Sequence, residues 1–344
     1  MSQVTRKHGP WIFDLPSRTR PIIDRCANEL ALSRNIRRTL EDVNPSGGGP
    51  WDYSDNLAVG TVKVLSRPTI LGPRAKASCR DSVLTLAMDL RPIPDHAALL
   101  IDGTILAVAD LHIGIEEELT EAGVHIPPQA DRMAKEVEAL AAQYRATTLV
   151  VLGDVKHFVP KMASRERRDV FLFFQRLLGT FDAIYVAQGN HDGLLRHVVP
   201  RAVKFRASPG FVLGDVGFCH GHAWPYRKVM AAKALVMGHN HPAVAFRDVM
   251  GSRTIQPCWM RIPFRRRHKR YAKLPREAVV VPALNELCGG VPVNDLRVNF
   301  LGPLFDPALL RTDDADIHLL DGTHLGKLRE IRVDAGFRRE DYRQ

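Results

Sequence analysis

The stretch Ile105-Leu106-Ala107-Val108-Ala109-Asp110-Leu111-His112 joins an apolar run to an acid and a histidine. Such a run is typical of a buried strand, and the polar residues come where that strand would end. Because the C-terminal ends of parallel strands share one edge of an open α/β sheet, groups at such ends can meet in one cleft. Four more motifs follow apolar runs in the same way: Gly153-Asp154, Gly189-Asn190-His191-Asp192, His220-Gly221-His222 and Gly238-His239-Asn240-His241.

The segments around these motifs predict the fold class. Residues 97–101 and 104–109, joined by Asp102-Gly103, predict a β-hairpin. Early helix–strand alternation followed by closely spaced strands predicts an α/β fold in which two sheets pack as a β-sandwich flanked by helices. We expect helices over 128–144 and 165–178, and strands over 148–152, 183–187, 210–213, 216–219, 234–237 and 243–246.

The polar groups in the motifs indicate a metal centre. Two divalent ions about 3.5–4 Å apart need a bridging carboxylate and further nitrogen or oxygen ligands on both sides. Imidazoles mixed with carboxylate and amide oxygens suit manganese, iron or zinc, whereas ligand sets made only of oxygen suit magnesium or calcium. A single D-x-H or G-D is more often a turn or a helix cap, but five motifs in order, each after a strand, indicate one site.

The ordered set D-x-H, G-D, G-N-H-D, H-G-H and G-H-x-H resembles that of the calcineurin-like metallophosphoesterases over residues 93–293. The resemblance implies two divalent metal ions, and we expect manganese, with iron or zinc as alternatives. It implies that His191 is a catalytic residue which protonates the leaving oxygen or stabilises the transition state. The implied ligands of the first metal are Asp110, His112 and His241, those of the second are Asn190, His220 and His239, and Asp154 would bridge the two.

A finer resemblance comes from the residues after Asp154. The chain continues Val155-Lys156-His157, where serine/threonine phosphatases of the superfamily carry an aspartate followed by Arg-Gly, which disfavours protein phosphatase activity. The segments 153–157 and 279–294 are similar to the DNA ligase-associated metallophosphoesterase branch and its archaeal counterparts. That likeness implies a part in DNA repair, with DNA ligase or helicase machinery as partners. We expect Lys156, His157 and His222 to bind substrate; the alternatives are a solvated Lys156 and a loop-stabilising His222.

Charge adds a hypothesis about the substrate. The net charge is +10 and the pI about 9.6, which favours polyanionic partners such as nucleic acid. The densest cluster, here called the basic run, consists of Arg265, Arg266, Arg267, Lys269 and Arg270. It could grip a nucleic-acid backbone, with Trp259 or Phe264 stacking on a base. The alternatives are a solvated hairpin tip and aromatic residues that belong to the core or its rim.

Composition sets the remaining bounds. The hydrophobic fraction of 45% is that of a globular chain, and no apolar stretch approaches the ~20 residues of a membrane helix. We therefore expect no membrane partner. The first thirty residues hold no continuous apolar run of the kind a signal peptide needs, so we expect a cytoplasmic location. The five cysteines are scattered and form no C-x-x-C pair, which argues against a disulfide framework and against a thiolate zinc knuckle.

Residues 1–90 differ from the rest of the chain. They are rich in Pro, Gly and Arg, and only residues 22–40 favour a helix. We interpret them as an N-terminal extension, either a disordered basic arm or the result of a mis-started reading frame with Met88 as the true start. Residues 91–344 are then the metallophosphoesterase domain.

Together these observations predict a metal-dependent hydrolase. A metal-bound hydroxide would attack a phosphodiester directly, with nucleic acid as the expected substrate and a nuclease or phosphodiesterase as the expected enzyme. Small phosphodiesters or nucleotides are one alternative. A non-catalytic scaffold on the same fold is another, although a scaffold gains nothing from keeping all seven ligands.

Overall fold

The computed structural model describes residues 88–248 and 252–333. The expected N-terminal extension, with its expected helix over 22–40, lies outside the described residues as far as position 87. The expected boundary at residue 91 falls within the first described strand, β1 (Leu90–Pro92). Among the described residues, no helix combines the length and the apolar character that crossing a membrane would require.

The first sheet follows the order of the chain. Its three N-terminal strands are antiparallel, and the later ones run parallel to β3. The expected hairpin is confirmed, and its turn residues Asp102 and Gly103 have φ values of 47° and 67°. Positive φ at both central positions is what a type I′ turn requires. The six strands described are β1, β2 (Ala98–Ile101), β3 (Ile105–Val108), β4 (Thr148–Val151), β5 (Ala183–Ala187) and β6 (Lys204–Arg206).

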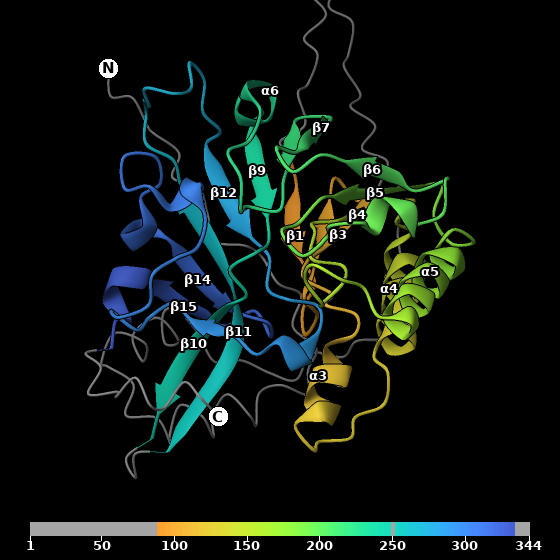
Figure 1. Ribbon diagram of the computed structural model, residues 1–344. Coiled ribbons are helices and arrows are strands. Elements are labelled where there is room, and N and C mark those ends of the chain that lie inside the picture. The colour runs from red at the N-terminus through yellow and green to blue at the C-terminus, as the bar shows by residue number, and fades with distance from the viewer. Residues whose placement is uncertain (1–87, 249–251, 334–344) are drawn as a thin grey trace, which may run out of the picture. The chain divides into compact units, whose positions relative to one another are not determined.

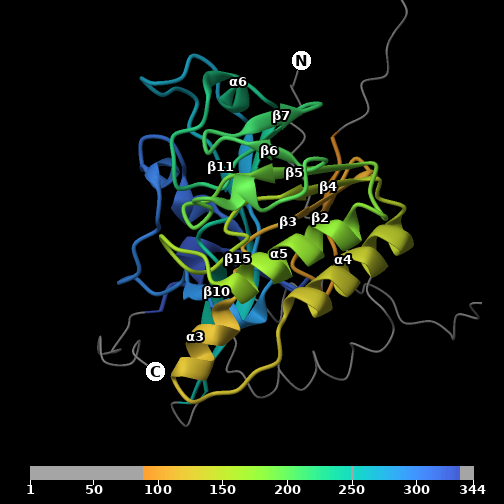
Figure 2. The same ribbon diagram turned by 45° about the vertical axis from the view of Figure 1, so that its right-hand side comes forward.

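Two long helices cover the outer face of this sheet. The helices α4 (Ala130–Tyr144) and α5 (Ser164–Leu177) lie side by side there, while α3 (Ile115–Glu121) lies apart from them (Figures 1 and 2). The residues that α4 buries include Met133, Val137 and Leu140, which the sequence places at helical spacing. The expected helices at 128–144 and 165–178 are thus confirmed to within two residues at each end.

The second sheet holds nine described strands. Seven follow the path β13-β10-β11-β12-β9-β8-β7, while β14 pairs with β11 and β15 pairs with β14. Its strands β8, β9 and β12 are parallel, and β8 and β9 lead into the last two motifs. The strands are β7 (Phe211–Leu213), β8 (Val216–Phe218), β9 (Ala234–Met237), β10 (Pro242–Arg247), β11 (Arg253–Pro263), β12 (Glu277–Val280), β13 (Val291–Pro292), β14 (Asp316–Leu319) and β15 (His324–Lys327). The short helices are α6 (Arg227–Met230), η1 (Leu195–His197), η2 (Glu286–Cys288), η3 (Pro303–Phe305), η4 (Thr312–Asp314) and η5 (Leu328–Glu330).

An apolar layer between the sheets makes the sandwich. Alternate residues of the first sheet, such as Ala107 and Val150, pack against Phe218, Val236 and Trp259 of the second. Side chains alternate across a strand, so the other residues of the first sheet face α4 and α5 instead. The two-sheet α/β sandwich predicted from the sequence is confirmed. Trp259 is completely buried and Phe264 is 7% exposed, so the core alternative is correct for both and neither lies open to a base.

Candidate metal centre

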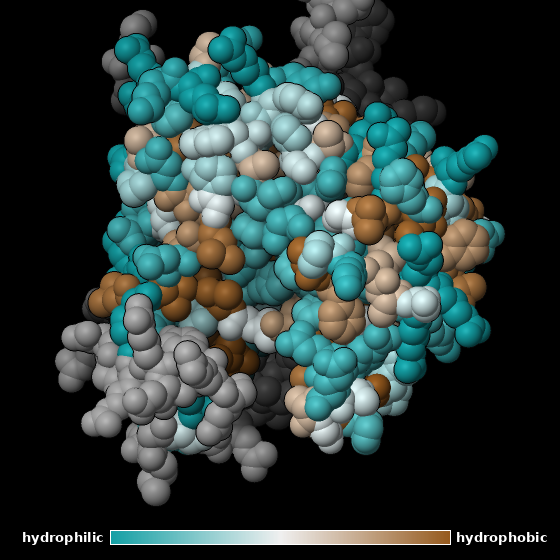
Figure 3. Space-filling model, viewed as in Figure 1, coloured by the Kyte–Doolittle hydropathy of each residue, from teal (hydrophilic) through white to brown (hydrophobic). Residues whose placement is uncertain are grey.

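The site lies where strands of both sheets end. In the first sheet, the motifs follow the C-terminal ends of β3, β4 and β5, which are parallel neighbours. In the second, they follow β8 and β9, also parallel neighbours. The backbone joins the sheets near this edge, where Leu284 N donates to Ala109 O at 2.9 Å. On the face seen in Figure 3, hydrophilic residues gather in the middle, between the elements of the two sheets.

Two glycines allow the motifs to approach one another. A Cβ atom on Gly153, whose φ is 88°, would lie 2.7 Å from His220 Nδ1. A Cβ atom on Gly189 would lie 2.2 Å from Asp154 Oδ1. Real Cβ atoms do not come this close, so the G-D and G-N-H-D turns can touch only because these positions lack a side chain. The sequence shows the glycines, but their partners become visible only in the structure.

The backbone of the predicted ligands is strained. Among the described residues other than glycine, nine have positive φ, and five of these are predicted ligands: Asp110, His112, Asp154, His239 and His241. A left-handed conformation costs about 1–3 kcal/mol for such a residue and persists where the surroundings enforce it, commonly at functional sites. This clustering marks the site independently of residue type.

Asp154 lies between the two sets of predicted ligands. Its Oδ2 is 3.3 Å from His220 Nε2 and 3.7 Å from His112 Nε2. His241 Nε2 lies 3.5 Å from Asp110 Oδ1. Donor atoms of Asp154, His220 and His239 lie within 4.8 Å of one another, and so do those of Asp110, His112 and Asp154. The two groups share Asp154, which is the arrangement that a bridging carboxylate needs.

The hydrogen bonds of His220 show that its donor set fits a cation. His220 Nδ1 donates to the carbonyl of Leu152 at 2.6 Å, which fixes the tautomer of the neutral ring. Its Nε2 then presents a lone pair to Asp154 Oδ2 and, at 3.1 Å, to Asn190 Oδ1. Three electron-pair donors that face one another need a proton or a metal ion between them. Together with the unpartnered Nε2 of buried His112, this arrangement fits a metal centre.

Electrostatics within the cluster follow from burial and from the carboxylates. Burial alone would lower the pKa of His220, but the hydrogen bond and charge of Asp154 raise it to about 9. Burial lowers the pKa of His112 to about 3, despite the nearby Asp110 and Asp154. Burial and the charge of His220 lower the pKa of His239 to about 4. His112 and His239 are therefore neutral near pH 7, and neutral rings beside carboxylates are the ligand chemistry that suits manganese, iron or zinc.

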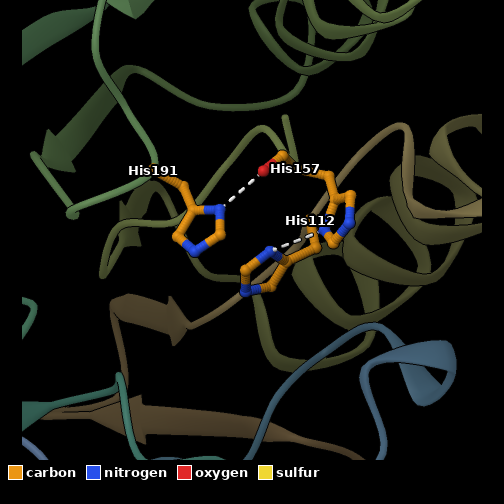
Figure 4. A group of neighbouring side chains, drawn as sticks. All are labelled: His112, His157 and His191. Atoms are coloured by element: carbon orange, nitrogen blue, oxygen red, sulfur yellow. Dashed lines mark hydrogen bonds between the residues drawn. The ribbon is translucent and has the colours of Figure 1, made fainter. Parts of the chain in front are cut away.

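Three histidines meet on one side of the cluster (Figure 4). His191 Nδ1 donates to the carbonyl of His157 at 2.6 Å, and its backbone N donates to Asp154 Oδ1 at 2.9 Å. His157 Nδ1 lies 3.3 Å from His112 Nδ1, while its Nε2 meets Glu118 Oε2. The ring of His191 is 4.8 Å from that of His112. His157 and His191 are therefore both placed at the predicted ligands.

The other expected substrate residues lie differently. His222 lies at the cluster, with its ring 5.2 Å from His220 and 6.0 Å from His239. Lys156 is completely buried, and its Nζ donates to the carbonyls of Phe158 and, at 3.4 Å, Lys161. A buried ammonium in these bonds cannot reach a ligand without breaking them. The solvated alternative for Lys156 is therefore wrong, and its phosphate contact stays a prediction.

The basic run connects β11 to β12 and is largely exposed. The run leads into the start of β12, where Glu277 pairs with Ala234 at the start of the parallel strand β9. The His239 motif follows the other end of β9. The basic run therefore leads into the end of the sheet that is opposite the His239 motif. One residue of the run contacts a residue close in sequence to the site. The Arg270 guanidinium lies 4.8 Å from the ring centroid of Trp224, which is two residues after His222. Arg265 lies apart, in a cleft of about 460 Å³ that Phe300 and Phe305 also line.

Asp192 is a site residue to which the sequence analysis gave no role. It is 1% exposed, its Oδ1 accepts from Val155 N at 2.8 Å, and its Oδ2 accepts from Gly189 N at 2.8 Å. Burial and the charge of Asp154 raise its pKa to about 6, against these backbone donors. One carboxylate thus fastens the G-D turn to the G-N-H-D turn. The sequence feature that could have pointed to Asp192 is its position as the fourth residue of the G-N-H-D motif.

Replacing Asp192 with Ala should destabilise the fold. Two buried backbone N–H groups would lose their acceptor, and each costs about 1–3 kcal/mol, so we expect the free energy of unfolding to fall by roughly 2–6 kcal/mol. Urea denaturation measures this change. The control is Asp182→Ala, an exposed position, where we expect a change within about 0.5 kcal/mol. Equal effects of the two substitutions would show that Asp192 does not hold the turns together.

Comparison with known proteins agrees with this geometry. Residues 103–258 match the family described as Calcineurin-like phosphoesterase, and this segment contains all seven predicted ligands. The matched segment, less than half of the chain, is thus similar to a class of hydrolases that act on phosphoester bonds. No curated protein sequence matches the chain.

Two solved structures resemble the chain at low similarity. One is nuclease MPE of Pseudomonas putida, with 19% identity and a TM-score of 0.38, over 67% of this chain and 96% of that one. The other is Yfce, a phosphoesterase from E. coli, with 17% identity and a TM-score of 0.31, over 65% and 97%. At these TM-scores neither likeness bears on the activity of this chain.

Proposed function

We propose that the chain is a dinuclear metal-dependent phosphodiesterase that acts on nucleic acid. The observation that carries the proposal is Asp154, whose Oδ2 lies within 3.7 Å of rings from both predicted ligand sets. Two divalent ions held there would stabilise charge on the phosphoryl oxygens and lower the pKa of a water molecule. Manganese, with iron or zinc as alternatives, is consistent with the mixed nitrogen and oxygen donors.

Residues of the chain would bind the two ions and transfer the proton. Asp110, His112 and His241 would hold one ion, Asn190, His220 and His239 the other, and Asp154 both. His191 donates its Nδ1 hydrogen to the His157 carbonyl, so Nε2 is the nitrogen that would carry the second proton of the imidazolium and give it to the leaving oxygen. Glu166 supports that carbonyl, since its Oε1 accepts from His157 N at 2.7 Å and Phe158 N at 2.9 Å.

The basic run supports a polymeric substrate over a small one. It is separated from the metal-side end of the sheet by the length of β12, four residues or about 13 Å. At about 3.4 Å per nucleotide in a stacked strand, some four nucleotides would cover this span. A dinucleotide bound at the metal centre could not reach the run, but a longer single strand could. Trp224, two residues after His222, contacts the run through the Arg270 guanidinium above its ring.

A salt titration tests this substrate. With Mn²⁺ present, we expect the chain to hydrolyse bis-p-nitrophenyl phosphate and single-stranded DNA. We expect the variant Arg266→Gln/Arg267→Gln/Lys269→Gln to bind single-stranded DNA with a log K against log salt slope shallower by about 2, since each phosphate contact contributes about 0.7. The small diester should be hydrolysed at the wild-type rate.

The control carries Arg167→Gln, Arg168→Gln and Arg201→Gln, three exposed arginines outside the basic run. It should keep the wild-type salt slope. If both triple variants behave alike, the run is only a solvated loop. If the wild type cleaves the small diester but neither binds nor cleaves DNA near physiological salt, small phosphodiesters are the substrate. If it cleaves no phosphoester with Mn²⁺, Fe²⁺ or Zn²⁺, the chain is a scaffold.

A further inference from the structure

A cysteine lies among the ligands predicted for the first metal. Donor atoms of His112, His241 and Cys288 lie within 4.8 Å of one another. The sulfur of Cys288 is 3.8 Å from the backbone carbonyl oxygen of Asp110, the third predicted ligand of that metal. The two other cysteines described, Cys219 and Cys258, are completely buried and belong to none of the metal-binding groups found among the described residues.

Hydrogen bonds on both sides fix the position of Cys288. Asn285 donates from its Nδ2 to the carbonyl of Leu111 at 2.8 Å, between Asp110 and His112. The same residue caps η2, since its Oδ1 accepts from Leu287 N and its carbonyl accepts from Cys288 N, both at 3.1 Å. After the cysteine, Val291 N donates to the carbonyl of His241 at 2.8 Å. The turn that carries Cys288 is therefore tied to both ligand motifs.

A second observation indicates that this side of the cluster lacks a partner atom. The side chain of His112 is 6% exposed, and its Nε2 is buried without a hydrogen-bond partner. A buried ring nitrogen in that state costs free energy unless something binds it. His112 therefore needs a partner atom for this nitrogen, and the same ring belongs to the group of donors that includes Cys288 and His241.

We propose that Cys288 supplies a sulfur ligand to the divalent cation held by Asp110, His112 and His241, an inference that rests on the proposed function. The step is a ligand exchange: the S–H proton passes to solvent, the thiolate donates an electron pair to the cation, and no electron is transferred. The thiolate is the form of cysteine that binds metals.

A sulfur ligand would change which metal this position prefers. Thiolates are soft ligands that favour zinc and similar ions, whereas manganese prefers carboxylate oxygen and water. The position that includes Cys288 should therefore select Zn²⁺ or Co²⁺ over Mn²⁺ more strongly than the position formed by Asn190, His220 and His239. The two positions of one centre would then hold different metals.

Cobalt spectroscopy on the full chain tests the inference without measuring activity. Titration of the metal-free protein with Co²⁺ should produce a sulfur-to-cobalt charge-transfer band in the near ultraviolet as well as weak d–d bands. In Cys288→Ser the charge-transfer band should vanish while the d–d bands remain. We also expect the zinc Kd of Cys288→Ser to rise at least about tenfold, the lower limit for loss of even an outer-shell partner. The manganese Kd should change far less.

The control is the double variant Cys26→Ser/Cys79→Ser, which keeps Cys288 and should keep the band. Cobalt that binds to the wild type without a charge-transfer band, or a band that persists in Cys288→Ser, would overturn the sulfur ligand and leave the proposed function intact. A wild type that binds no cobalt would instead overturn the metal centre and the inference together. The wild-type spectrum decides the question even if Cys288→Ser does not fold.

Discussion

Asp154→Asn should release both metal ions at once. Asn keeps the size of the side chain but removes the negative charge and one strong acceptor, and Asp154 Oδ2 is the atom that faces both His112 and His220. Metal analysis of protein dialysed against Mn²⁺ should show two ions per chain in the wild type and none bound tightly in the variant. Because metals supply several kcal/mol of transition-state stabilisation, phosphodiester hydrolysis should fall by about 10³-fold or more.

Two comparisons make this result specific. Asp110→Asn should weaken mainly the ion held with His112 and His241, so one ion should remain. Asp182→Asn, at an exposed position, should change neither metal content nor rate. A variant at Asp154 that retains one tightly bound ion would show that this carboxylate belongs to a single metal and bridges nothing.

His191→Ala should lower kcat by about 10²–10⁴-fold with metal content unchanged, because general acid catalysis contributes that much and this ring is predicted to bind no metal. The loss should be largest for substrates with a poor leaving group, such as DNA. It should be small for p-nitrophenyl esters, whose leaving group needs little protonation. Steady-state rates on both substrates, with metal analysis of the same samples, measure the effect.

The control for this substitution is His125→Ala, at an exposed position, which should leave both rates unchanged. His191 N also donates to Asp154 Oδ1, but alanine keeps that backbone bond, so the bridging carboxylate stays in place. Loss of metal in His191→Ala would show that the ring is a ligand. An equal loss on both substrates would show that it does not protonate the leaving group.

The fold and the location of the site could be predicted from local sequence patterns. The 105–112 stretch, the Asp102-Gly103 turn and the helical spacing in 128–144 are short-range signals, and each is confirmed by β3, the hairpin and α4. Because the C-terminal ends of parallel strands share one edge of a sheet, the motifs at these ends could be predicted to lie together. Strand and helix periodicities are properties of neighbouring residues, which is why they can be read from the chain alone.

Only the tertiary structure decided which polar side chains serve the site and which serve the fold. Lys156 and His157 are adjacent in sequence, yet the lysine is buried in its own loop and the histidine lies against His112 and His191. Asp192 and Cys288 acquire partners that are distant in the chain, across 37 residues to Val155 and 178 residues to Asp110. Side-chain direction and long-range hydrogen bonds depend on how the two sheets pack, and no local pattern of residues records that packing.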